Sequence, residues 1–148
     1  WQVAITTLMF ERAGLGAAAV IGLKRSMEDL IAIVRERGLD EDPVVRQKIA
    51  ELQIGVEAMR LGSLRSLTQT MKTGIPGPEG SLTKWEWADY NQELTELAND
   101  VLGPEGMRAG TDWSYRFLRS RANSIEGGTT EVLQNIIAER VLGLPRLR

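Results

Sequence analysis

Residues 17–37, AAAVIGLKRSMEDLIAIVRER, indicate the fold class most clearly. Apolar side chains recur there every three or four positions, at Val20, Leu23, Met27, Leu30, Ile31 and Val34. This spacing places them on one face of an α-helix, because an α-helix has about 3.6 residues per turn. We therefore predict a helix from about residue 4 to 37 that buries this face against other helices.

The same periodicity continues through the rest of the chain. A second helix is predicted from Pro43, with Asp42 as its N-cap, to about Lys72. The glycine- and proline-rich stretch that follows predicts a flexible loop at about 74–81. A third helix is expected to start just after it.

Two shorter helices are predicted in the C-terminal part. The first spans about residues 112–121, and the second begins after Thr129, which is its N-cap. No segment alternates with the two-residue period of a strand. The sequence therefore predicts an all-α, antiparallel four-helix bundle, built as a single domain over residues 1–148 from three long helices and a shorter terminal one.

Composition excludes several functions. The 148 residues include no cysteine and no histidine, and the formal net charge is −2 at pH 7. A disulfide, a thiolate metal site and a Ser-His triad are thus excluded, and we expect no bound metal. Acid–base chemistry is left to carboxylates, lysine or tyrosine. The mixed charges argue against nucleic-acid binding, no stretch is apolar enough to span a bilayer, and the lack of cysteine fits a cytoplasmic protein.

The most informative stretch is residues 124–140, SIEGGTTEVLQNIIAER. It resembles the C-terminal signature of acyl-CoA dehydrogenases, where a Gly-Thr pair opens the last helix. Residues 8–12, LMFER, resemble the start of the family's first C-terminal helix, and residues 98–106, ANDVLGPEG, resemble its Q-x-L-G-G-x-G turn. The resemblance covers nearly the whole chain. It implies that the chain is the helical third of a three-domain subunit, and that the isolated fragment is inactive.

The resemblance implies FAD-dependent α,β-dehydrogenation of an acyl-CoA thioester, with a carboxylate as base. Most of the family carries the base where this chain has Gly127, whereas a minority class carries it on the first helix, where this chain has Glu11. We therefore expect Glu11 to be the base, and Glu126 is the alternative. Arg12 is expected to order the base or the thioester, and Gly128 to contact substrate through a backbone N–H group.

The resemblance also implies contacts with FAD. Arg37 falls at the family's flavin-contacting arginine, which reaches the pyrophosphate of a neighbouring subunit. Thr129 and Glu131 are expected to touch the flavin from the last helix, and Asp100 and Gly103 from the turn after the third helix. An electron-transfer flavoprotein or a similar acceptor, and assembly into a homo- or hetero-oligomer (dimer or tetramer), are the implied partners.

Two departures from the family pattern keep other functions open. Asp100 stands where the family has Gln, and Pro104 replaces a Gly of the turn. An acid near a pyrophosphate is electrostatically unfavourable. The alternatives are a non-catalytic partner subunit of a heteromeric acyl-CoA dehydrogenase, and a helical domain used for assembly.

Overall fold

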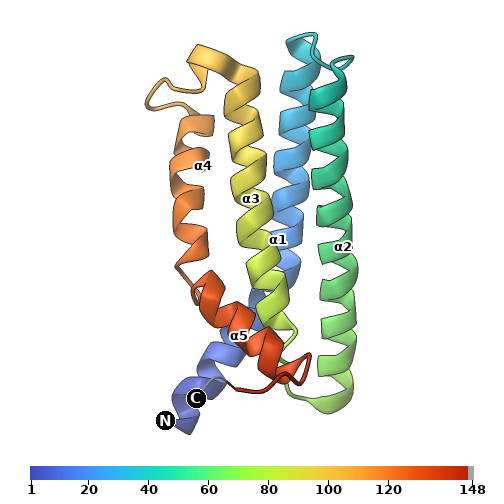
Figure 1. The fold of residues 1–148 in the computed structure, drawn as a ribbon, viewed down its shortest axis with the longest axis vertical. Coiled ribbons are helices and arrows are strands. Elements are labelled where there is room, and N and C mark those ends of the chain that lie inside the picture. The colour runs from blue at the N-terminus through green and yellow to red at the C-terminus, as the bar shows by residue number, and fades with distance from the viewer. Residues whose placement is uncertain (147–148) are drawn as a thin grey trace.

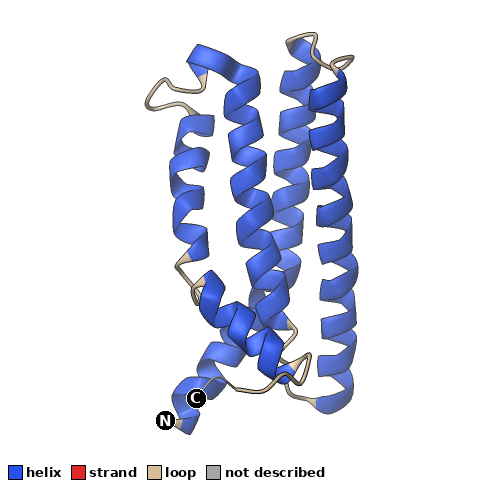
Figure 2. Cartoon of the chain, in the orientation of Figure 1, coloured by secondary structure: helices blue, strands red, loops and turns tan. Residues whose placement is uncertain are grey.

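The computed structural model describes residues 1–146, apart from the side chains at positions 9, 12, 13, 15 and 17. Over this range the chain is helical and contains no strand (Figure 2), so the all-α prediction is confirmed. The elements are α1 (Gln2–Glu36), α2 (Pro43–Thr73), α3 (Gly80–Leu102), η1 (Gly103–Glu105), α4 (Asp112–Ser120), η2 (Arg121–Ser124) and α5 (Thr130–Arg140). No helix in the described range combines the length and hydropathy needed to cross a membrane.

Helices α1 to α4 run alternately up and down the long axis of the molecule, and α5 crosses the lower end obliquely (Figure 1). The short helix that lies along α3 is thus α4, while the terminal helix packs across the start of α3. The 3-10 turn η2 and the two glycines after it separate α4 from α5. Because both glycines have positive φ, the chain changes direction there.

Local capping explains where the long helices begin and end. Asp42 caps α2 as predicted, since its carboxylate accepts hydrogen bonds from the N–H groups of Val44 at 2.8 Å and Val45 at 3.0 Å. Gly38, with φ +67°, lets the chain leave α1. Helix α3 already begins at Gly80, so the connection after α2 spans residues 74–79.

The core lies among the three long helices. The apolar positions that the periodicity selected on α1 are all buried, apart from Ile31, which is half-buried. The buried cluster consists of Val20, Leu23, Met27, Leu30, Val34, Leu52, Val56, Met59, Leu94, Leu97, Ala98 and Val101. On α5 only Leu133 is fully buried, Val132 is 48% exposed, and Val141, the C-cap after the helix, is 43% exposed. The terminal helix therefore packs on the bundle through one side and leaves apolar surface uncovered.

A glycine sets the spacing between α2 and α3. A Cβ atom at Gly55 would lie 2.4 Å from Cζ of Tyr90, which is closer than real Cβ contacts come. The tyrosine ring occupies the space that a side chain at this position would need. The contact therefore requires glycine for steric reasons, although Gly55 lies inside a helix and costs helix propensity.

Candidate functional site

The predicted site residues fall at two ends of the bundle. Arg37, Asp100 and Gly103 lie at the upper end in Figure 1, where α1 and α3 finish. The start of α5 lies at the lower end, beside the first turn of α3. The rise of 1.5 Å per residue from Lys84 to Gly103 separates the two ends by about 28 Å. One copy of the chain therefore does not bring all the predicted residues together.

The loop that opens α5 has an unusual backbone. Gly127 and Gly128 have φ values of +66° and +110°, a region that L side chains rarely adopt. A Cβ atom at Gly127 would also lie 3.3 Å from Cε of Lys84. Lys84 is 1% exposed, and its ammonium donates hydrogen bonds to the carbonyl oxygens of Asn123 and, at 3.1 Å, Gly128. The backbone and the neighbouring lysine thus both favour glycine at position 127.

Glu126 is held in a hydrogen-bonded ion pair. Its two carboxylate oxygens accept from the two terminal nitrogens of Arg119 at 3.0 and 2.8 Å, and Oε1 also accepts from Nδ2 of Asn123 at 2.6 Å. These bonds, with that from Arg119 largest, lower the pKa of Glu126 although partial burial opposes them. A base gains from a raised pKa, so this environment does not prepare Glu126 to accept a proton.

Glu11 lies on α1 with an exposed side chain. The neighbouring Arg12 lies outside the residues whose side chains are described, so its predicted role stays a prediction. The rise per residue from Glu11 to Arg37 corresponds to about 39 Å along α1. Glu11 thus belongs to the lower half of the molecule, the half that also contains the start of α5 (Figure 1).

The start of α5 confirms Thr129 as the N-cap, while the flavin contacts of Thr129 and Glu131 stay predictions. The Thr129 hydroxyl caps the helix by accepting from the Val132 N–H at 3.4 Å. The Glu131 carboxylate bonds to its own N–H and to the Thr129 side chain, and both bonds lower its pKa. Glu131 is exposed, so its carboxylate lies at the surface of the helix start.

Arg37 forms an ion pair with Glu105 of η1. The pair joins the end of α1 to the turn after α3, and the two side chains are 37% and 68% exposed. The predicted flavin-contacting arginine therefore already has an anionic partner within the chain. Residue 105 lies in the turn predicted to bind the cofactor, but nothing in its spacing from Arg37 predicts this pair.

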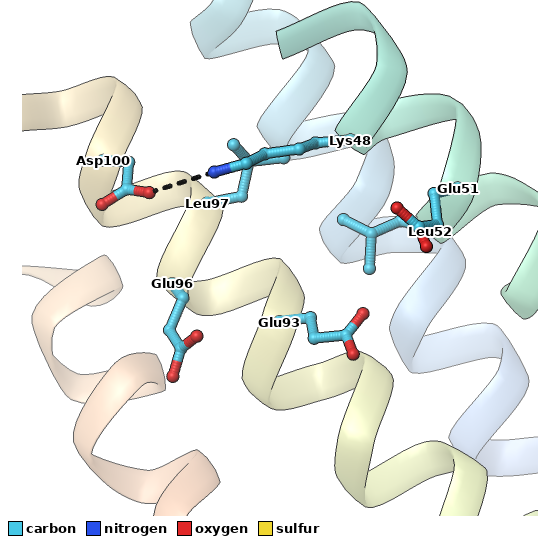
Figure 3. A pocket seen from close by; sticks show the side chains of 7 residues that line it. All are labelled: Lys48, Glu51, Leu52, Glu93, Glu96, Leu97 and Asp100. Carbon is cyan, nitrogen blue, oxygen red and sulfur yellow. Dashed lines mark ion pairs between the residues drawn. The ribbon is translucent and has the colours of Figure 1, made fainter. Parts of the chain in front are cut away.

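Asp100 points towards α2 and forms an ion pair with Lys48, with 3.6 Å between Oδ2 and Nζ (Figure 3). It lines a groove of about 250 Å³ between α2 and α3. That groove also contains three glutamates, Glu51, Glu93 and Glu96. Burial, followed by the charges of neighbouring acids, raises the pKa of Glu93. The groove is thus acidic and unsuited to a phosphate.

Gly103 ends α3 with φ +59° and borders a second groove, of about 780 Å³, between α3 and α4. Asn99, Phe117 and Leu118 also line this groove, which is less charged than the first. The described side chains form no cluster suited to hold a metal ion.

Three residues of the lower end were missed from the sequence: Lys84, Arg119 and Asn123. Lys84 follows polar residues at the start of α3, and nothing in the spacing distinguishes it from a solvated lysine. Its burial depends on α5 folding back over α3, which is a tertiary contact. Arg119 lies seven positions before Glu126, across a change from α4 to η2 that helical periodicity does not predict.

Comparison with known proteins gives the family. A profile described as "Acyl-CoA dehydrogenase, C-terminal domain" matches residues 1–142. The chain belongs to the acyl-CoA dehydrogenase family. The matched range includes every helix of the bundle, so the family's C-terminal domain and the fold described above are the same unit.

Curated relatives of the family come from mycobacteria. Acyl-CoA dehydrogenase IpdE1 of Mycolicibacterium smegmatis is 37% identical over 150 residues, covering 99% of this chain and 37% of that protein. Acyl-CoA dehydrogenase FadE34 of Mycobacterium tuberculosis is 31% identical, covering 99% of this chain and 20% of that protein. The chain thus spans well under half the length of these acyl-CoA dehydrogenases.

Solved structures agree. The "Tcur3481-Tcur3483 steroid ACAD" matches with a TM-score of 0.82 and 27% identity, covering 99% of this chain and 40% of that one. A glutaryl-coenzyme A dehydrogenase in complex with glutaryl-CoA matches with a TM-score of 0.81 at 17% identity, covering 97% of this chain and 38% of that one, which shows the shared fold.

Proposed function

We propose that the chain is the C-terminal domain of an FAD-dependent acyl-CoA dehydrogenase that forms the α,β double bond of an acyl-CoA thioester. The match of residues 1–142 to the family's C-terminal domain carries this proposal. A 37% identical relative bears the name acyl-CoA dehydrogenase. The whole protein would act in the cytoplasm and pass electrons to an electron-transfer flavoprotein or a similar acceptor.

We assign the base to Glu11. Gly127 carries no side chain, and both its positive φ and the nearby Lys84 disfavour one there. Glu126 is paired with Arg119, which lowers its pKa. Glu11 has an exposed carboxylate on the helix where a minority of the family carries the base.

The residues at the two ends fit FAD to different degrees. At the start of α5, the Thr129 hydroxyl and the helix N-terminus offer hydrogen bonds to an oxygen-rich group. At the upper end, Arg37 offers the cation that a pyrophosphate needs, once Glu105 is displaced from it. Asp100 is turned to Lys48, so it need not oppose the pyrophosphate. The residues therefore fit FAD if two copies of the chain contribute to one site, one copy with its upper end and the other with its lower end.

The proposed roles of this chain are those of positioning and proton transfer. A carboxylate oxygen of Glu11 takes the proton as the Cα–H bond breaks. The N–H of Gly128 orients the thioester end, and α5 covers the reacting atoms from water. FAD, when bound, supplies a ring that accepts the hydride from Cβ.

Assembly into an oligomer is part of the proposal. One face of α2 exposes apolar side chains at spacings close to whole helical turns: Ile54, Leu61, Leu64, Leu67 and Met71, which are 49–80% exposed. This stripe is more extensive than the single apolar residues scattered over an ordinary protein surface, and it is typical of a surface that another chain covers. A homo- or hetero-oligomer, dimer or tetramer, would bury it.

Turnover by the full-length protein tests the assignment of the base. Glu11→Gln should retain bound flavin and lose at least about 1,000-fold in kcat, because an amide cannot accept the proton. Activity is measured over straight-chain, branched and steroid-linked acyl-CoA thioesters with an artificial electron acceptor. Glu126→Gln is the matched control and should keep most of the activity. Loss of turnover in Glu126→Gln with survival in Glu11→Gln would transfer the role to Glu126.

A second candidate is a non-catalytic partner subunit of a heteromeric acyl-CoA dehydrogenase. The acidic upper end favours it, since Glu105 is paired with Arg37 and Asp100 lies in the last turn of α3, next to the flavin-directed turn. The 27% identical steroid ACAD is named for two components, Tcur3481 and Tcur3483. Flavin content separates the candidates: one FAD per subunit in the purified protein alone supports the catalytic subunit, and flavin only in a co-purified heteromer supports the partner subunit.

A further inference from the structure

Lys84 is one of the most deeply buried side chains of the molecule and carries a charge. It lies in the first turns of α3 and is 1% exposed. Burying an ammonium group is unfavourable unless hydrogen bonds replace its water. Here backbone carbonyl oxygens supply those bonds. A lysine kept at such cost suggests that its ammonium does something an apolar side chain cannot.

The two carbonyl oxygens flank the loop that opens α5. One belongs to Asn123 in η2 and the other, at 3.1 Å, to Gly128, just before the N-cap of α5. The ammonium therefore connects both ends of residues 124–127. The ammonium thus ties both ends of this loop to α3, so Lys84 sets how the loop enters α5.

The stem of the lysine shapes the same loop by contact. The Cε atom of Lys84 would lie 3.3 Å from a Cβ atom at Gly127, and a Cβ at Gly128 would lie 3.2 Å from Leu133. The loop thus passes close to the lysine stem on one side and to α5 on the other. Its positive φ angles are held between two fixed neighbours.

Side chains around the ammonium extend this arrangement. Asn123 is 2% exposed, and its Oδ1 atom accepts from Nδ2 of Asn91 on α3 at 2.8 Å. Its Nδ2 atom donates to Glu126, which also pairs with Arg119. The carbonyl that Lys84 holds thus belongs to a residue that is itself tied to α3. The network joins α3, η2 and the loop.

We propose that Lys84 is a positioning residue, whose buried ammonium holds residues 124–128 so that the N-terminus of α5 faces the reacting thioester. This rests on the proposed function, because α5 matters for turnover only if its start borders the substrate. The lysine itself would not touch substrate or flavin. It would act through the backbone of Gly128, the residue proposed to orient the thioester.

Amide hydrogen exchange in the full-length protein tests the structural half. Lys84→Met keeps the stem and removes the donors, so the peptide over residues 123–131 should exchange about tenfold faster or more, since the buried carbonyl of Asn123 and the half-buried carbonyl of Gly128 lose this donor. Peptides from the α1–α2 core should change little. Lys24→Met is the matched control, because Lys24 forms an exposed ion pair with Glu57 at 3.7 Å, and it should leave the loop unchanged.

Kinetics test the functional half. With an acyl-CoA that the wild type turns over, Lys84→Met should lower kcat about tenfold or more, with a smaller change in KM, and should slow flavin reduction in a single turnover by the same factor. Lys84→Arg, which retains a charged donor, should restore part of both the loop protection and kcat. An arginine variant as damaged as the methionine variant would show that volume, not hydrogen bonding, matters.

Other results would overturn the proposal in distinct ways. Local positioning would be refuted if Lys84→Met left the exchange of residues 123–131 unchanged. It would also be refuted if the core peptides exchanged faster by the same factor as the loop, or if neither Lys84 variant folded. If only Lys84→Met fails to fold, wild-type protection in Lys84→Arg supports the proposal and lost protection refutes it. A wild type without dehydrogenase activity would instead refute the proposed function, while the exchange result would still stand for the loop.

Discussion

Replacing Glu126 with Gln should destabilise the fold at neutral pH without removing the proposed chemistry. The carboxylate makes two bonds to Arg119 and one to Asn123. The variant keeps one acceptor oxygen but loses the charge, and its amide nitrogen can donate only where an acceptor is available. At least one of the donors of Arg119 and Asn123 then loses its partner.

The magnitude follows from the exposure of the pair. Side chains of Arg119 and Glu126 are 47% and 39% exposed, so water screens their attraction, and a bidentate pair of this kind contributes about 1 kcal/mol. The shorter bond to Asn123 adds a few tenths after the same screening, and the free energy of unfolding should fall by about 1–1.5 kcal/mol. For a domain of this size the corresponding fall in Tm is about 3–5 °C.

The effect depends on pH with a definite sign. Arg119 above all, and Asn123, lower the pKa of Glu126 in the folded state, although partial burial opposes them. The unfolded chain has the ordinary glutamate pKa of about 4.3. The stabilisation is therefore fully present above that value and is lost as pH falls through the lower folded pKa. The difference between wild type and Glu126→Gln should shrink as the solution is acidified.

Thermal unfolding of the 148-residue chain, followed by far-ultraviolet circular dichroism, measures this difference at pH 7 and at several acidic values. Glu28→Gln on α1 is the matched control, because Glu28 is exposed, and it should change the free energy of unfolding by less than about 0.5 kcal/mol. A Tm difference that stays constant with pH, or no difference at pH 7, would contradict the reasoning. Lost turnover of the full-length Glu126→Gln variant, with unchanged stability of the domain, would mark Glu126 as a reactant.

Two further predictions concern the upper end and the helix spacing. Glu105→Gln should release Arg37 and tighten FAD binding by the full-length protein about two- to fivefold, measured by flavin fluorescence, and weaker binding would show that Glu105 helps hold the cofactor. Gly55→Ala should lower the free energy of unfolding by about 1–2 kcal/mol, because its methyl group meets Tyr90. The control Gly62→Ala has nothing within 4 Å of its Cβ position and should raise the free energy of unfolding by about 0.5–1 kcal/mol. Equal effects of the two substitutions would refute the steric argument.

The helical bundle could be predicted because its determinants are local. The spacing from Val20 to Val34 fixes the buried face of α1, and Asp42 with Pro43 fixes the start of α2. Caps and periodicity act within a few residues, so they can be read along the chain. The order of α4 and α5 in space could not be predicted in this way, because it depends on the turn at η2.

The candidate site was less predictable for the same physical reason. Local helix-start signals placed Thr129 correctly as a cap, and the absence of a side chain at Gly127 was evident from the sequence. The partners of Arg37, Asp100 and Glu126 come from distant or irregular segments, and spacing does not identify such pairs. Whether Glu11 acts as the base stays a prediction, since its environment would include residues beyond this domain.

The separation of Arg37 from Glu11 along the bundle has a genetic consequence. If each flavin site takes its upper part from one copy and its lower part from another, a lesion at one end damages a different site from a lesion at the other end. Two defective alleles, one altered at Arg37 and one at Glu11, would then restore some activity when expressed together, because mixed assemblies include sites in which both contributing ends are intact. Co-expression of the two alleles would thus reveal a site shared between subunits, which neither allele reveals when expressed alone.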